Sequence, residues 1–165
     1  MARARLFLLC LLAIGLAGCK QRAAGEIRSR LPDFSLEDLA GHRLSSADLR
    51  GKVVIIDFWA TWCEPCKKEM PGFQAMLDRY GPRQLGAVGL KFDIMEDTED
   101  PLQFAARLGI HYPLAVATDD LKRKFGGIEG LPTTMLYDRN GILRRKVIGF
   151  EYPSVVEAEV KELLR

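Results

Sequence analysis

The sequence is short of the residues that build metal centres and disulfide frameworks. Its 165 residues include only four cysteines and two histidines. Cys63 and Cys66 form the one close pair, because the other two cysteines fall in an apolar N-terminal segment. A structural zinc site needs about four ligands, and His42 and His111 are far apart in the sequence. This shortage disfavours a zinc site and leaves no spare thiol in the body of the chain for a structural disulfide.

The sequence also lacks an excess of charge of either sign. Arg3 and Arg5 account for two of the 24 basic residues and lie in a segment expected to be removed, which leaves 22 to balance the 22 acidic residues. A near-neutral protein has no electrostatic footprint for nucleic acid. The sequence contains no internal repeat and no low-complexity segment. With 48% hydrophobic and 28% charged residues, it has the composition of a single globular domain, which we expect to be a monomer.

The N-terminal segment has the features of an export signal. Two arginines precede an almost unbroken apolar run over residues 6–16, which is shorter than the roughly 20 residues of a membrane-spanning helix. The run ends in Leu-Ala-Gly-Cys at 16–19, which resembles the bacterial lipobox, where a diacylglyceryl group is attached to the cysteine and the chain is cut before it. We predict a signal peptide over 1–18 and a lipidated Cys19, in preference to an ordinary signal peptide or an uncleaved signal anchor.

The predicted lipid anchor also indicates where in the cell the protein is located and where its folded domain begins. Two or three lipid chains hold a protein at a membrane more stably than one. Residues 19–30 are polar and basic without an apolar period, which is typical of a tether. We therefore expect a folded domain over 31–165, held at the bacterial cell envelope and facing the periplasm or another extracytoplasmic space. The choice between inner and outer membrane stays open.

The body of the chain alternates strand and helix patterns. The β-branched run over 53–58 predicts a strand buried on both faces at the centre of a sheet. Further strands are predicted over 85–92, 133–137 and 143–148, a small hairpin over 31–45, and helices over 64–80, 100–108, 119–125 and 154–164. Pro71 is expected to kink the first of these helices. This order predicts an α/β fold whose mixed central sheet is flanked by helices.

Cys63 and Cys66 lie between the predicted central strand and the start of a helix. Unpaired backbone N–H groups and the helix dipole stabilise a thiolate there, so Cys63 is expected to be the nucleophile. Two intervening residues bring the sulfur of Cys66 within bonding distance across the first turn, in a more buried position. Cys66 is therefore expected to resolve a mixed disulfide. A bond that closes so short a loop adds little stability, which argues against a purely structural disulfide.

Two segments resemble the motifs of a known fold. Residues 56–67, Ile-Asp-Phe-Trp-Ala-Thr-Trp-Cys-Glu-Pro-Cys-Lys, resemble the thioredoxin active-site signature, and residues 130–134, Gly-Leu-Pro-Thr-Thr, resemble its cis-proline loop. The N-terminal hairpin, the Cys-Glu-Pro-Cys-Lys-Lys-Glu string and the insert before the proline resemble the TlpA/ResA-type membrane-tethered reductases. The resemblance covers residues 31–165 and implies a thioredoxin-like fold with an N-terminal hairpin and a central αβ insert.

Two acidic residues are candidates for managing protons at this site. Asp57 stands in an otherwise apolar strand, where desolvation raises a carboxyl pKa. The resemblance implies that it passes protons to or from Cys66, and the alternative is a solvated, merely polar strand end. Glu69 matches an acidic residue that influences thiol ionisation in ResA-like proteins. It is equally compatible with a solvated carboxylate on the helix surface.

Five further residues are predicted to contact substrate. The resemblance implies that Pro132 is cis and sits against the cysteines, and that the backbone of Leu131 pairs with an extended substrate segment. Trp62 and Pro65 are expected to shape the site. Glu64 adds negative charge beside the sulfurs, which opposes the thiolate and favours a reducing potential.

The predicted activity is the reduction of disulfides in exported proteins, with no cofactor beyond the cysteines themselves. The resemblance implies a membrane dithiol as electron donor, and apocytochrome c thiols are the leading substrate hypothesis. A dithiol oxidant is one alternative. A copper metallochaperone is another, although the copper-delivering relatives of this fold use a wider cysteine spacing with a histidine. A peroxiredoxin is disfavoured because the Pro-x-x-x-Thr-x-x-Cys pattern is absent.

Overall fold

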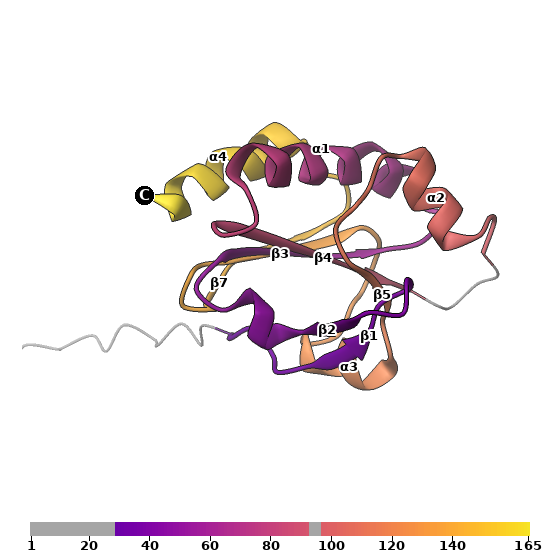
Figure 1. Cartoon of the computed structure of the whole chain (residues 1–165), viewed down its shortest axis with the longest axis horizontal. Coiled ribbons are helices and arrows are strands. Elements are labelled where there is room, and N and C mark those ends of the chain that lie inside the picture. Colours follow the sequence, from indigo (N-terminus) through magenta and orange to yellow (C-terminus); the bar gives the residue numbers. More distant parts are fainter. Residues whose placement is uncertain (1–28, 93–96) are drawn as a thin grey trace, which may run out of the picture.

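A five-stranded mixed sheet organises the protein in a computed structural model that describes residues 29–92 and 97–165 (Figure 1). Across the sheet the strands run in the order β5 (Leu114–Val116), β4 (Leu85–Lys91), β3 (Val53–Trp59), β6 (Thr133–Tyr137), β7 (Leu143–Ile148). β3 pairs in parallel with β4 and antiparallel with β6, and β4 pairs in parallel with β5. A separate antiparallel hairpin joins β1 (Ser35–Glu37) to β2 (Arg43–Ser45). The arrangement confirms the predicted thioredoxin-like α/β fold.

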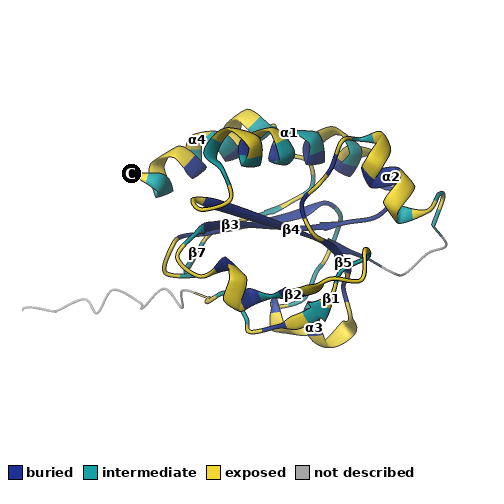
Figure 2. Ribbon diagram, viewed as in Figure 1, coloured by how far each residue is buried: buried dark blue, intermediate teal, exposed yellow. Residues whose placement is uncertain are grey.

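β3 is buried along its whole length and divides the core in two. Side chains alternate between the faces of a strand, so Val53, Ile55 and Trp59 pack under α1 (Glu64–Tyr80), α2 (Pro101–Arg107) and α4 (Pro153–Leu164). The even-numbered side chains of β3 face the hairpin, the 3₁₀ helix η1 (Ser46–Leu49) and α3 (Asp119–Lys124). Figure 2 shows the sheet buried between two layers whose outer surfaces are exposed.

The helix boundaries follow from local chemistry. α1 spans the predicted residues, contains Pro71, and ends at Gly81, whose φ of 75° suits a glycine. α2 begins at Pro101, after Asp100 accepts hydrogen bonds from two backbone N–H groups of the first turn. The three-residue strand β5 completes the predicted αβ insert, although the sequence patterns located only its helix. In the described part of the chain, no helix has both the length and the apolar character to cross a membrane.

The polypeptide enters the domain along the turn between β6 and β7. Leu143 N donates to Ser29 O and Leu31 N donates to Gly141 O, each at 2.8 Å, and Arg30 forms a β-bridge with Ile142. In the register of β3 with β6, this turn lies beside the first residues of β3. The cysteines follow the last residue of β3, so the two features lie at opposite ends of the sheet. The predicted signal peptide and Cys19 lie outside the described residues.

Candidate active site

The cysteine pair forms a disulfide at the start of α1. The two sulfurs are 2.03 Å apart, and Cys66 N donates a hydrogen bond of 3.3 Å to the Sγ atom of Cys63, which caps the helix. A helix N-terminus stabilises negative charge, so the geometry favours a thiolate on Cys63 after reduction. Cys63 is 3% exposed and Cys66 is fully buried. Cys66 is therefore the more buried of the two, as predicted, but the difference in exposure is small in the disulfide form.

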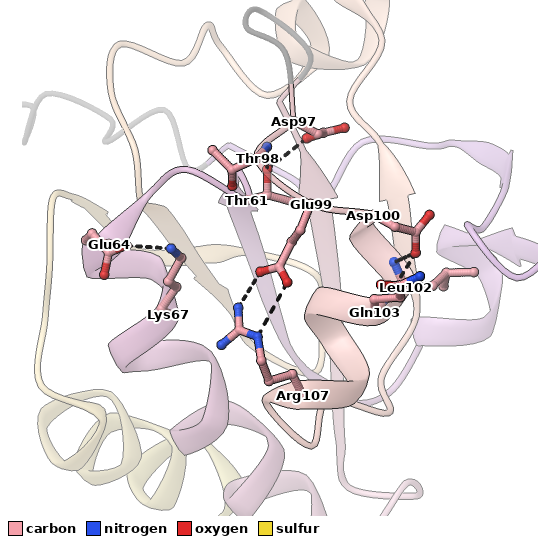
Figure 3. A network of polar contacts seen from close by, with 10 residues as sticks. All are labelled: Thr61, Glu64, Lys67, Asp97, Thr98, Glu99, Asp100, Leu102, Gln103 and Arg107. Atoms are coloured by element: carbon pink, nitrogen blue, oxygen red, sulfur yellow. Dashed lines mark hydrogen bonds and ion pairs between the residues drawn. The ribbon is translucent and has the colours of Figure 1, made fainter.

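The loop between β3 and α1 is held by residues of the insert (Figure 3). Thr61 Oγ1 donates to Asp97 Oδ1 at 3.0 Å and accepts from Thr98 N at 3.1 Å. Lys91, at the end of β4 and only 4% exposed, places its Nζ atom 2.8 Å from Asp97 Oδ2. These contacts join β4, the insert and the active-site loop. They were not predicted from the sequence, where the only indication of them is a lysine at the end of a buried strand.

Figure 3 shows two charged pairs in this region, one on α1 directly after Cys63 and one between Glu99 and α2. Glu64 pairs with Lys67 one turn along α1, and that hydrogen bond lowers the pKa of the Glu64 carboxyl. On α2, Arg107 pairs with Glu99 and lies 5.6 Å from the centre of the Phe104 ring. Because Lys67 partly compensates Glu64, the predicted opposition between Glu64 and the thiolate is weaker than its position alone suggests.

Asp57 is 1% exposed, on the face of β3 that packs under α1. It stands opposite Gly89 on β4 and Thr134 on β6. Within residues 29–92 and 97–165, its carboxyl oxygens have no hydrogen-bond partner. Burial raises the pKa of Asp57 well above its usual range, and the nearby charge of Glu69 adds to the shift. The solvated alternative for Asp57 is therefore excluded.

Glu69 is also buried, on the inward face of the second turn of α1. Its Oε1 atom accepts a hydrogen bond from Thr134 Oγ1 at 3.3 Å, and its Oε2 atom accepts from Glu151 N at 3.2 Å. Burial raises the pKa of Glu69 to about 7, although both hydrogen bonds oppose the shift. Thr134 also stands opposite Asp57, so it neighbours both acidic residues. This arrangement excludes the surface alternative for Glu69.

The proline loop precedes β6 directly. The Leu131–Pro132 peptide is cis, as predicted. Pro132 O accepts from Gly149 N at 2.8 Å, which ties the loop to the end of β7. Leu131 is half-buried and packs against both cores, and Trp62 packs against the core under α1. Pro65 is exposed beside the cysteines.

A buried tyrosine near the two acids was not predicted. Tyr112 is 6% exposed, and its hydroxyl has no hydrogen-bond partner among the residues that the structure describes. Burial raises its pKa well above the usual range, with further contributions from Asp57 and Glu69. The same part of the chain holds no cluster of three or more histidine, cysteine, aspartate or glutamate residues suited to a metal ion. The local chemistry is that of a dithiol with buried carboxyl groups.

Comparisons with known proteins agree with this chemistry. Residues 27–146 match the model of the AhpC/TSA family. The chain is 32% identical over 143 residues to thiol-disulfide oxidoreductase ResA of Geobacillus kaustophilus, covering 87% of this chain and 81% of that protein. It is 32% identical over 119 residues to thioredoxin-like protein YneN of Bacillus subtilis, covering 72% and 69%. It superimposes on a thioredoxin-family thiol:disulfide interchange protein of Chlorobium tepidum with a TM-score of 0.76, at 31% identity, covering 84% and 97%.

Proposed function

This chain belongs to the AhpC/TSA family and is a thioredoxin-like thiol-disulfide oxidoreductase of the ResA type, and we propose that it reduces disulfides in exported proteins from a membrane-anchored position. The observation that carries the proposal is the Cys63–Cys66 disulfide at the start of α1, with two buried carboxyl groups on the adjoining core. The predicted export signal and lipobox support a site of action outside the cytoplasm. Exported apocytochrome c remains the leading substrate hypothesis.

The roles of the two sulfurs follow from their positions. The Cys63 thiolate attacks a substrate sulfur and forms a mixed disulfide, and Cys66 then attacks Cys63 and releases the reduced substrate. Two electrons pass from the protein dithiol to the substrate, and a membrane dithiol donor afterwards reduces the Cys63–Cys66 bond. Asp57 and Glu69 accept or supply the accompanying protons. Leu131 and Pro132, with Trp62, Glu64 and Pro65, form the surface that meets the substrate chain.

A trapping experiment tests this division of labour. Cys66→Ser removes the resolving thiol, so substrate should stay covalently attached to Cys63, while Cys63→Ser should trap almost nothing. Both variants would be expressed in an exporting host, quenched with acid and run on non-reducing gels. The adducts should dissolve in dithiothreitol. Adducts that form through Cys66, or tight copper binding by the wild type with no adduct in either variant, would overturn the assignment in favour of a metal carrier.

The direction of electron flow needs a second measurement. The Glu64–Lys67 pair weakens the argument that charge beside the sulfurs favours a reducing potential. Equilibration of the purified protein with glutathione and with thioredoxin gives its reduction potential. A value near that of thioredoxin, about −270 mV, fits the proposed reductant, and a value near −120 mV identifies the oxidant instead.

A further inference from the structure

A basic cavity of about 330 Å³ lies at the end of the sheet opposite the disulfide. It is bounded by the start of β3, the loop after η1 and the turn between β6 and β7. Four cationic side chains line it: Arg30, Arg50, Lys52 and Arg139. We call this cavity the basic pocket.

The acidic residues of the basic pocket do not cancel its charge. Asp138 is buried, and its carboxylate accepts from the backbone N–H groups of Asn140 and Ile142 and lies 2.7 Å from Arg144. Its charge is therefore already compensated by a partner that does not line the cavity. Asp33, which also lines the cavity, lies 3.9 Å from Arg50 and accepts from Ser46 Oγ at 3.4 Å, so it offsets one of the four cationic charges. The pocket keeps a net positive charge with guanidinium groups on its rim.

The polypeptide enters the domain at this same cavity. Arg30 and Leu31 line it, and the hydrogen bonds of Ser29 and Leu31 with the β6–β7 hairpin fix the direction of the chain there. Figure 1 shows the described chain beginning beside β7, away from α2. Ser29 lies ten positions after Cys19, a reach of about 35 Å when fully extended. An anchor at Cys19 therefore keeps the basic pocket close to the lipid surface.

We propose that the basic pocket binds the phosphate of an anionic phospholipid headgroup and seats this end of the domain on the lipid surface. Guanidinium groups bind phosphate oxygens in paired hydrogen bonds. Each cation near an anionic surface favours the seated state by roughly fivefold. The proposal rests on the lipid anchor of the proposed function, and incorporation of labelled fatty acid at Cys19 tests that anchor separately.

Amine labelling of the full chain in vesicles tests the seating. The protein is reconstituted with phosphatidylcholine alone or with added phosphatidylglycerol, treated with an amine-acylating reagent, and read by mass spectrometry. Lys52 should react several-fold more slowly in the anionic vesicles, and high salt should remove the difference. Lys68, exposed on α1 beside the disulfide, serves as the internal reference and should react equally in both. Equal labelling of Lys52 in both vesicles, in protein whose Cys19 carries lipid, overturns the proposal.

Matched variants and a free anion complete the test. Arg30→Gln with Arg50→Gln should abolish the protection of Lys52 in anionic vesicles. The control, Arg123→Gln with Lys124→Gln, removes the same charge from α3 outside the pocket and should leave the protection intact. If both double variants lose the protection of Lys52, the attraction to the membrane is unspecific and a defined site is refuted. In the last arm, inorganic phosphate is added to the phosphatidylcholine vesicles. If it protects Lys52 as well as the anionic vesicles do, the ligand of the pocket is a free anion and the membrane proposal is overturned.

Discussion

We propose that two buried carboxyl groups, Asp57 and Glu69, exchange protons with the redox pair. Reduction of a disulfide to a dithiol takes up two protons with two electrons, and the opposite step releases them. Glu69, with a pKa raised to about 7, is close to half protonated at neutral pH, and burial raises the pKa of Asp57 well above its usual range. A carboxyl whose pKa lies near the working pH transfers protons most effectively in both directions.

Asp57→Asn should slow disulfide exchange by about 10²-fold and change its pH dependence, because the amide cannot carry the proton of Cys66. The measurement is the rate of reaction with a model disulfide between pH 5 and 9. Glu69→Gln should act in the same direction but more mildly. Asp138→Asn, which alters a buried aspartate at the far end of the sheet, controls for general damage. A wild-type rate–pH profile in the Asp57 variant would remove Asp57 from the chemistry.

Glu69→Gln should make stability less dependent on pH. The pKa of Glu69 is about 7 in the folded protein against 4.5 for the free group, so the folded state holds the proton more tightly. Its contribution to stability is complete below pH 4.5 and is lost as the pH rises through 7. Relative to the wild type, the variant should gain up to about 3 kcal/mol between pH 4.5 and 8. Urea unfolding of the oxidised proteins at pH 5 and pH 8 measures this difference. If the free energy of unfolding changes equally with pH in the wild type and the variant, the prediction is wrong.

At the scale of elements, α1 and α4 approach each other too closely for an added methyl group. A Cβ atom at Gly72 would lie 2.3 Å from Pro153 Cβ and 2.5 Å from its Cγ. Helix propensity alone predicts that Gly72→Ala stabilises the protein by about 1 kcal/mol. The contact predicts the opposite, a loss of about 1–3 kcal/mol from overpacking.

Urea unfolding followed by circular dichroism separates these two expectations. Gly72→Ala combined with Pro153→Gly removes the opposing Cβ and Cγ atoms, so the double variant should lose less than the two single changes together. If Gly72→Ala alone is more stable than the wild type, the close approach of α1 and α4 is not a constraint.

Elements with strong local signals were predictable, and elements defined by distant partners were not. The helix over 64–80 has apolar residues at a helical period and a glycine stop, and its observed bounds match the prediction. β5 has three residues, Leu-Ala-Val, and exists through its pairing with β4. The Lys91–Asp97 contact likewise depends on how the insert folds back over the active-site loop. The burial of Glu69 depends on β6 and on the backbone of Glu151, which no local pattern encodes.

At the scale of the molecule, the fold separates where the chain enters from where the chemistry takes place. The Cys-x-x-Cys string follows the end of β3 and the proline loop precedes the start of β6. Because β3 and β6 pair antiparallel, with Phe58 opposite Thr133, both motifs lie at the same end of the sheet. Their proximity followed from the resemblance. The basic pocket at the other end could not be predicted, because its cations come from three separate segments that share no motif.

This separation predicts that anchoring and catalysis are independent. Wild-type protein should fractionate with membranes and incorporate labelled fatty acid, whereas Cys19→Ser should do neither. With a soluble disulfide substrate, both proteins should react at the same rate, because Ser29 and the cysteines lie at opposite ends of the sheet. Cell fractionation, radiolabelling and a stopped-flow assay measure the three quantities. Membrane association without label in the wild type would exclude the lipobox, and a slower soluble reaction in Cys19→Ser would show that the anchored end influences the disulfide.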